Sequence, residues 1–295
     1  MSLRHLYDVP APAKLNLFLH VVGKRADGYH LLQSAFVLLD WQDTLHFERR
    51  NDGQISREDL HTPLPPDDLC LRAARALQAA SSTTQGVHIR IDKQIPSGAG
   101  MGGGSSDAAT TLLALNRLWG LNWPRPQLQS LALPLGADVP FFVGGRNAWV
   151  EGIGEKLTPI DLPQQTFVVA KPPTGAQTSL VFTNPLLAVR PHAGIVCGFL
   201  AQHIPQFTEG WGQNDLQAAA EAVCPDIAKA LQLLNAQFGN SRTTGSGSAV
   251  FAKLNENQNC STSAASLWLE SLPPGWVSRV CVSQSAHPLQ GWASD

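Results

Sequence analysis

The sequence predicts an α+β protein of two domains, and its length, its hydrophobic content and the order of its elements favour that class. The chain has 295 residues, which at roughly 150 residues per domain corresponds to about two domains. Hydrophobic residues make up 43% of the chain and charged residues 15%, so it can bury a substantial core. Strand-like and helix-like stretches follow one another in an order that favours helices packed on an antiparallel sheet.

The N-terminal region predicts strands joined as hairpins. Apolar residues occupy every second position from Leu15 to Val21, which is typical of a half-buried strand. Residues 31–40 and 44–50 predict two further strands, and Asp27-Gly28 predicts the turn before them.

Helices and strands follow in the rest of the first half. Apolar residues at helical spacing predict helices over 69–80 and 127–135 and, after a glycine-rich stretch, a helix with Ala108, Leu112, Leu115 and Trp119 on one face. Residues 86–95 and 147–151 predict strands.

Pro163 precedes a new strand, which places the predicted domain boundary near residue 162 and the two domains at 1–162 and 163–295. The second domain contains predicted helices around 186–201, 215–222 and 226–237 and predicted strands over 166–170, 248–254 and 276–282.

Composition argues against several classes of partner and compartment. The net charge of -2 argues against a basic nucleic-acid surface. An apolar run of the roughly 18 residues that a membrane span needs is missing, and the N-terminus lacks a signal core. The five cysteines are odd in number and contain no CxxC pair, and the nine histidines show no metal-ligand spacing. We therefore expect a soluble, cytoplasmic protein with reduced thiols and no zinc site.

A glycine-rich stretch precedes the helix that contains Ala108. Residues 95–118 read IPSGAGMGGGSSDAATTLLALNRL, with five glycines between Gly98 and Gly104. A helix N-terminus has unpaired N–H groups and a partial positive charge, and glycines let the backbone approach an anion closely. Ser105 and Ser106 add hydroxyl donors. The stretch predicts a binding site for a polyphosphate.

Two common phosphate loops do not match this stretch. A Walker loop requires a lysine after its glycines, which is missing here. A dinucleotide fingerprint fits the spacing loosely, but it serves a parallel βαβ unit rather than a sheet that begins with hairpins. A flexible surface loop that binds nothing is the remaining alternative.

The string PSGAGMGGGSSDAAT resembles the phosphate-binding motif of the GHMP kinases, which are named after galacto-, homoserine, mevalonate and phosphomevalonate kinases. Four other stretches extend the resemblance in the order that the family shows them: PAPAKLNLFLHVVGKRADGYHLLQS at 10–34, LGADVPFF at 135–142, EGIGEKLTPI at 151–160 and RTTGSGSAVFA at 242–252. The resemblance spans nearly the whole chain.

The resemblance implies a two-domain GHMP kinase fold, with an N-terminal α+β domain that carries the glycine-rich ATP loop and a ferredoxin-like C-terminal domain. The first stretch resembles one branch of the family in particular. That branch uses ATP to phosphorylate the 2-hydroxyl of the methylerythritol part of a cytidine diphosphate conjugate, in the non-mevalonate route to isoprenoid precursors. ATP and Mg²⁺ are thus the implied cofactors.

The resemblance also assigns the catalytic and ATP-binding residues. Asp138 is implied to be the base and Lys14 its cationic partner; a turn aspartate and a solvated strand lysine are the structural alternatives. Because Pro140 disfavours helix at Val139, we expect the chain to be extended just after the base. The ATP loop comprises Pro96, Ser97, Gly98, Ala99, Gly100, Met101, Gly102, Gly103, Gly104, Ser105 and Ser106.

A further set of residues matches the family's substrate pocket. Tyr29 offers an aromatic face for a cytosine and His30 a hydrogen bond to its edge, although a structural role is the alternative for both. The full implied set is Asn16, Tyr29, His30, Ile153, Thr178, Phe182, Gly245 and Gly247. The wording around Thr178 departs from the family pattern.

Two departures concern the nucleotide side. Asp68 and Asp107 stand where asparagine is expected, and an aspartate repels phosphates unless a metal or a lysine intervenes. The protein ligands of Mg²⁺ are not evident, with Ser105 as a candidate. Two alternatives remain: another kinase of the same fold that acts on a different alcohol, and a nucleotide-binding sensor without turnover, against which the presence of both Lys14 and Asp138 argues.

Overall fold

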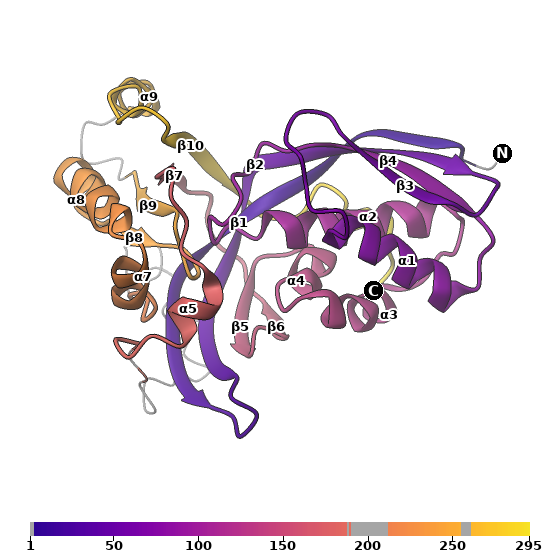
Figure 1. Ribbon diagram of the computed structural model, residues 1–295, viewed down its shortest axis with the longest axis horizontal. Helices are drawn as coiled ribbons and strands as arrows, with labels where there is room; N and C mark the ends of the chain where they lie inside the picture. The colour runs from indigo at the N-terminus through magenta and orange to yellow at the C-terminus, as the bar shows by residue number, and fades with distance from the viewer. Residues whose placement is uncertain (1–2, 188, 190–211, 255–260) are drawn as a thin grey trace.

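The computed structural model describes residues 3–187, 189, 212–254 and 261–295. In these ranges the chain is α+β, with ten strands in one mixed, mainly antiparallel sheet and helices packed against it (Figure 1). Most of the helix predicted around 186–201 lies outside the described residues. No helix in the described part is long and apolar enough to cross a membrane.

Two long strands form the centre of the molecule. β1 (His5–Lys24) and β2 (His30–Arg50) pair antiparallel, and the tip of their hairpin projects from the body (Figure 1). Strand β2 continues through residues 41–43, where Gln42 and Asp43 pair with β1 and Trp41 is buried. The two strands predicted over 31–40 and 44–50 are therefore one strand. The prediction of a half-buried first strand is also wrong, since both faces of β1 are buried from Ala11 to Val21.

The first half of the chain extends the sheet through β4 (Gly86–Asp92) and β5 (Ala148–Gly152), which pair with β2, and through β3 (Ile55–Asp59) and β6 (Lys156–Pro159), which pair with β4 and β5, respectively. Helices cover one face of this sheet (Figure 1). The helices are α1 (Leu69–Ser81), α2 (Gly103–Leu118), α3 (Arg125–Ala132) and α4 (Val139–Gly144), with a 3₁₀ turn at Leu133–Leu135. Helix α2 is buried along most of its length and packs against α1, α4 and β1.

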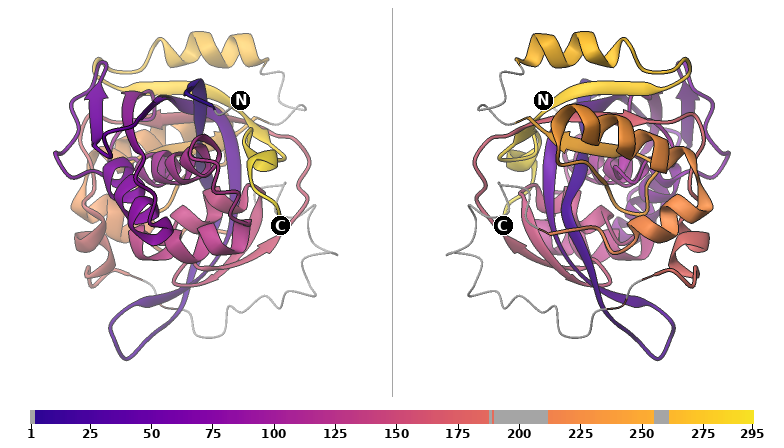
Figure 2. Two further views of the ribbon diagram at one scale, coloured as in Figure 1. Left: turned by 90° about the vertical axis from the view of Figure 1, so that its right-hand side faces the viewer. Right: turned by 90° about the vertical axis from the view of Figure 1, so that its left-hand side faces the viewer.

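The second half continues the same sheet (Figure 2). Its strands are β7 (Thr166–Lys171), β8 (Arg242–Thr243), β9 (Val250–Lys253) and β10 (Val277–Gln284). Its helices are α5 (Thr178–Phe182), α7 (Gln217–Val223), α8 (Asp226–Phe238) and α9 (Thr262–Leu269), and a 3₁₀ turn follows at Gln290–Trp292. Strand β10 pairs with β7 and, through Ser283 and Gln284, with β2, so hydrogen bonds join the two halves. The domain boundary near residue 162 stays a prediction.

One local prediction near the site is wrong. The chain is not extended after Asp138, because α4 begins at Val139 and includes Pro140 in its first turn. Proline is tolerated there, since the first N–H groups of a helix have no partner within the helix. Asp138 therefore stands immediately before a helix.

Candidate active site

Lys14 and Asp138 face each other where β1 passes the start of α4. Lys14 Nζ lies 3.5 Å from Asp138 Oδ2, and the side chains are 3% and 28% exposed, respectively. Burial lowers the pKa of Lys14, and the neighbouring carboxylate opposes that shift. The pair combines a buried cation with a carboxylate that solvent still reaches.

Asn16 holds the lysine from the same strand. Its Oδ1 accepts a hydrogen bond from Lys14 Nζ at 2.5 Å, and its Nδ2 donates to Ser34 Oγ at 3.0 Å. The ring of Phe36 lies 4.5 Å from the same amine, which is a cation–π contact. The Asn16 amide, the Asp138 carboxylate and the Phe36 ring therefore fix the position of the Lys14 amine.

The glycine loop, residues 96–106, passes between β1 and the segment after β8. Met101 O accepts a hydrogen bond from Lys14 N at 3.0 Å, and Gly98 O and Ala99 O accept from Ser248 N and Ala249 N, both at 3.0 Å. A Cβ on Gly100 would lie 2.2 Å from the backbone oxygen of Thr244. The close approach explains why glycine is required at position 100.

The loop leads directly into α2. Gly102 has φ +72°, and a Cβ there would lie 3.0 Å from the Phe142 ring and 3.3 Å from Lys14 Cγ. The N-terminus of α2 and its partial positive charge thus lie next to Lys14. An anion bound at this N-terminus would be held beside the Lys14–Asp138 pair.

The two serines of the loop differ in their surroundings. The Ser106 hydroxyl is buried, and no hydrogen-bond partner for it exists within the part of the chain that the structure describes. Ser105 Oγ lies 3.9 Å from where a Cβ on Gly136 would stand, so it lies beside the segment that leads to Asp138. Both serines lie at the N-terminal corner of α2, where the sequence predicts an anion site.

The aromatic residues of the predicted substrate pocket gather at the β1–β2 hairpin and α5. The rings of His30 and Phe182 lie 5.5 Å apart at an interplanar angle of 31°. Burial, and secondarily the charge of Lys24, lower the pKa of His30, which favours a neutral imidazole. Tyr29 directly precedes β2, with 60% of its surface exposed. Within the described ranges, no hydrogen bond or ion pair links these residues to Lys14 or Asp138.

The remaining predicted substrate residues approach the glycine loop from other elements. Thr178 Oγ1, at the start of α5, lies 2.9 Å from Ser246 Oγ, which stands between Gly245 and Gly247. A Cβ on Gly245 would lie 3.0 Å from Gly100 O. Ile153 is half-buried in the β5–β6 turn, and the next residue packs near Ala137. These segments border the region that contains Asp138 and the loop.

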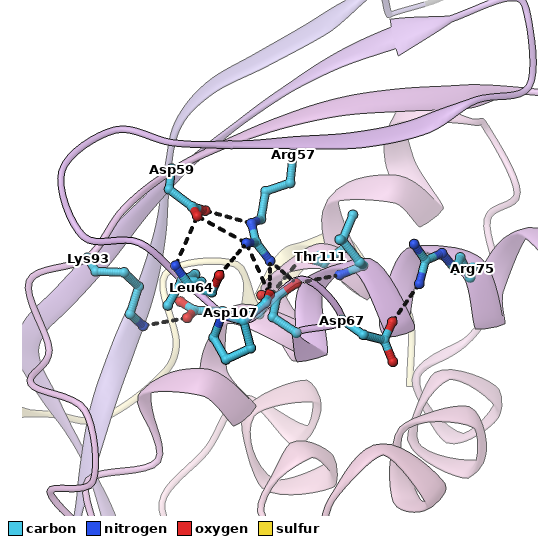
Figure 3. A network of polar contacts seen from close by, with 11 residues as sticks. Arg57, Asp59, Leu64, Asp67, Arg75, Lys93, Asp107 and Thr111 are labelled. Atoms are coloured by element: carbon cyan, nitrogen blue, oxygen red, sulfur yellow. Dashed lines mark hydrogen bonds and ion pairs between the residues drawn. The ribbon is translucent and has the colours of Figure 1, made fainter.

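Asp68 and Asp107, the two departures on the nucleotide side, each pair with a cation, and Figure 3 shows the pair that Asp107 forms with Lys93. Asp68 caps α1 by accepting from Leu71 N at 3.1 Å and pairs with Arg57 at 2.5 Å. Asp107 pairs with Lys93 at 2.5 Å. The sequence leads us to expect a metal or a lysine beside an aspartate at this position, and Asp107 has Lys93 as its partner.

Sequence reasoning missed several residues that shape this site. Thr244 Oγ1 accepts from Asn16 N at 3.0 Å, and Phe36 and Phe142 line the lysine and the loop. Asn214 Nδ2 donates to Thr243 O at 3.0 Å and to Gly245 O at 2.7 Å, which fixes the start of the RTTGSGSAVFA stretch at 242–252. The sequence could have pointed to Thr244, because it directly precedes Gly245 in the same glycine-rich stretch. It could not have pointed to Asn214, because the role of Asn214 depends on long-range packing.

Comparison with known proteins agrees with this arrangement. The sequence-family model named GHMP kinases N terminal domain matches residues 68–146, which contain the glycine loop and Asp138. Two curated relatives are named 4-diphosphocytidyl-2-C-methyl-D-erythritol kinase. The one from Variovorax paradoxus is 55% identical over 302 residues, covering 99% of this chain and 100% of that protein. The one from Methylibium petroleiphilum is 57% identical over 293 residues, with the same coverage.

Solved structures show the same relationship. A crystal structure of 4-(cytidine 5'-diphospho)-2C-methyl-D-erythritol kinase superposes with a TM-score of 0.76 at 33% identity, covering 93% of this chain and 98% of that one. The homoserine kinase from Cytophaga hutchinsonii superposes with a TM-score of 0.68 at 16% identity over 95% of each chain, which shows a shared fold alone. With its α+β fold, its glycine loop and these relatives, the chain belongs to the GHMP kinase family.

Proposed function

We propose that this chain uses ATP to phosphorylate the 2-hydroxyl of 4-diphosphocytidyl-2-C-methyl-D-erythritol, in the methylerythritol phosphate route to isoprenoid precursors. The named relatives at 55% and 57% identity over 99% of the chain support the substrate. The observation that carries the reaction is the Lys14–Asp138 pair beside the N-terminus of α2. That geometry brings a base, a cation and an anion site together.

Asp138 acts as the general base. Its carboxylate accepts the proton of the substrate hydroxyl, whose oxygen forms a bond to the γ-phosphorus of ATP. The bond from that phosphorus to the bridging oxygen breaks, and ADP leaves with the bridging oxygen and its electron pair. A positioned base contributes about 10²–10⁴-fold to such a step.

Lys14 supports the base through its charge. The amine lies 3.5 Å from the carboxylate, so it can also stabilise the hydroxyl oxygen from which Asp138 takes the proton. Asn16 and Phe36 keep the amine from turning away. The chain thus holds the reacting groups in place, which supplies most of the rate in phosphoryl transfer.

ATP fits the glycine loop by its chemistry. The N–H groups at the start of α2 suit phosphate oxygens, and the buried Ser106 hydroxyl adds a donor that no protein group uses in the described part of the chain. The predicted loop, from Pro96 to Ser106, is therefore assigned to the triphosphate.

Mg²⁺ is assigned to the same corner. Mg²⁺ usually keeps several waters and binds substrate phosphates, so it needs few ligands from the protein. We assign the Ser105 hydroxyl to it. When bound, Mg²⁺ neutralises charge on the phosphate oxygens.

The cytidine diphosphate part is assigned to the residues around the β1–β2 hairpin and α5. His30 and Phe182 supply two ring faces that lie close together, and Tyr29 supplies an exposed one. Asn16, Ile153, Thr178, Gly245 and Gly247 complete the proposed pocket.

Buried free thiols at Cys70, Cys224 and Cys281 agree with the proposed cytoplasmic location.

The test is ADP release in the presence of Mg²⁺ and ATP, with four acceptors offered separately: 4-diphosphocytidyl-2-C-methyl-D-erythritol, methylerythritol phosphate, mevalonate and homoserine. We expect turnover with the cytidine conjugate alone. Turnover with another alcohol would reassign the pocket, and ATP binding without turnover on any acceptor would replace the kinase with a sensor.

A further inference from the structure

Lys93 connects the two ends of the glycine loop. Its Nζ bonds Asp43 Oδ2 and also Asp107 Oδ2, and the three side chains are 7%, 0% and 3% exposed. Asp43 belongs to β2, whereas Asp107 belongs to the first turns of α2. A single buried amine therefore joins the sheet before the loop to the helix after it; Figure 3 shows its contact with Asp107.

Asp43 fixes the entry to the loop. Its Oδ1 accepts hydrogen bonds from Gln94 N at 2.6 Å and from Ile95 N at 2.7 Å. Trp41 Nε1 donates to Gln94 O at 3.0 Å. The N–H and the C=O of Gln94 are thus both hydrogen-bonded to side chains of β2.

The exit of the loop lies against the same amine. A Cβ on Gly103, the first residue of α2, would lie 3.4 Å from Lys93 Nζ and 3.0 Å from a methyl carbon of Ile95. The two ends of the loop, at Ile95 and Gly103, therefore contact each other. Lys93 and its two carboxylate partners hold these ends together.

The charges explain why a lysine is suited to this position. Burial lowers the pKa of Lys93, but Asp107 and Asp43 outweigh it and raise that pKa to about 12. Burial raises the pKa of Asp107 well above its ordinary range, Asp43 adds to that shift, and Lys93 opposes it. Without the amine, Asp43 and Asp107 would lie beside the loop with no cation between them.

We propose that Lys93 is a positioning residue for ATP, which sets the geometry of the glycine loop by joining Asp43 to Asp107. The inference rests on the proposed function in taking ATP as the ligand of this loop. The amine contacts neither the phosphates nor the reacting hydroxyl in this role; it acts through the backbone of residues 94–103.

The test uses the double variant Lys93→Met/Asp107→Asn. Lys93→Met alone leaves two buried carboxylates without a cation and is expected to fold poorly. The double variant removes one positive and one negative charge, so the net charge of the cluster is kept and only the connection is lost. Asn240→Ala serves as the control, because Asn240 bonds Phe238 O and Lys253 O in the second half of the chain.

Three quantities are measured: hydrogen exchange of the ligand-free protein over residues 94–106, the Kd of ATP with Mg²⁺, and the KM of the alcohol substrate. In the double variant we expect exchange over 94–103 to be about tenfold faster and the Kd of ATP to be about tenfold higher, with the KM of the alcohol little changed. The control should lower Tm and leave exchange over 94–106 and the Kd of ATP as in the wild type.

Wild-type exchange over 94–106 in a folded double variant would overturn the proposal, and so would faster exchange with an unchanged Kd of ATP. A uniform loss of affinity for both substrates would also overturn it, since that result indicates a general loss of stability. The exchange and ATP-binding measurements need no turnover, so they distinguish a failure of this inference from a failure of the proposed kinase reaction.

Discussion

Asn16 and Thr244 are separated by 228 positions in the chain, yet they share two hydrogen bonds. Asn16 N donates to Thr244 Oγ1 at 3.0 Å, and Thr244 Oγ1 donates to Asn16 Oδ1 at 3.2 Å. The same Oδ1 accepts from Lys14 Nζ. The second half of the chain therefore takes part in orienting Lys14, the proposed partner of the base, which belongs to the first half.

Asp138→Asn should lower kcat by about 10²–10⁴-fold, because the amide cannot accept the hydroxyl proton. The Kd of ATP should stay close to that of the wild type, since the loop and the start of α2 are unchanged. Steady-state kinetics and calorimetric titration with ATP check both parts. A near wild-type kcat would remove Asp138 from the mechanism.

Gly100→Ala should destabilise the ligand-free protein more than Gly98→Ala. Both glycines have positive φ, +75° and +63°, so both variants carry a backbone cost of about 1–2 kcal/mol. At position 100 the new Cβ also meets Thr244 O at 2.2 Å, whereas at position 98 nothing lies within 4 Å. Urea denaturation of the two variants measures the difference, and equal free energies of unfolding would show that the contact with Thr244 is unimportant.

Much of the fold could be predicted because its elements carry local signals. The apolar spacing of α1 and α2 and the alternation in β4 depend only on neighbours in the sequence. The short elements β3 and α5 were missed, since pairing and packing with distant segments decide whether they form. The continuity of β2 was missed for the same reason, because pairing with β1 outweighs its polar residues at 42–44.

The site could be predicted in part. Lys14 and Asp138 were identified through motifs, and the structure brings them together. The contacts of Asn214 and Lys93 could not be predicted, because each joins segments that are distant in sequence or tied by tertiary packing. Burial decides the behaviour of Lys93 and Asp107, and burial is a property of the folded chain alone.

The pH profile of kcat/KM should have its alkaline limb below pH 10.5, the ordinary pKa of a lysine. Burial lowers the pKa of Lys14, and the reaction needs its charged form beside Asp138. Activity should therefore fall as pH rises through this lowered pKa. The profile is measured under conditions in which the protein stays folded by circular dichroism; a limb at or above 10.5 would contradict a role for the buried amine.

Phe182→Ala should raise the KM of the cytidine conjugate and leave the Kd of ATP unchanged. The Phe182 ring lies 5.5 Å from the His30 ring, and stacking of a base on an aromatic side chain contributes about 1–3 kcal/mol. Leu267→Ala is a suitable control, since Leu267 is 67% exposed on α9. An unchanged KM for Phe182→Ala would place the cytosine elsewhere.

Asp107→Asn should gain stability relative to the wild type as pH rises from about 5 to about 8. The pKa of Asp107 is raised in the folded state above its ordinary value of 3.8. The wild type therefore loses stability as pH rises from that value through the raised pKa, whereas the amide does not titrate. Melting temperatures of both proteins across this range test the sign.

Asp59→Asn is the matched comparison for that experiment. Burial raises the pKa of Asp59, but hydrogen bonds from Arg57 and the Leu64 N–H outweigh it and lower the pKa below 3.8. The Asp59 carboxylate therefore stabilises the fold above its ordinary pKa, and its loss should cost stability across the whole range. A gain for Asp59→Asn, or a loss for Asp107→Asn that grows with pH, would contradict the assigned directions.

Because β10 pairs with both β7 and β2, the two halves of the chain should stay associated after a cut between them. The connecting residues Asp161, Pro163 and Gln164 are exposed, so a protease can nick the chain between the halves. The two fragments would nevertheless stay together, because β10 is hydrogen-bonded to β2 through Ser283 and Gln284 and Arg125 bonds the backbone of residues 290 and 293. Such a nicked protein should elute as one species in native gel filtration and separate into two bands only after denaturation.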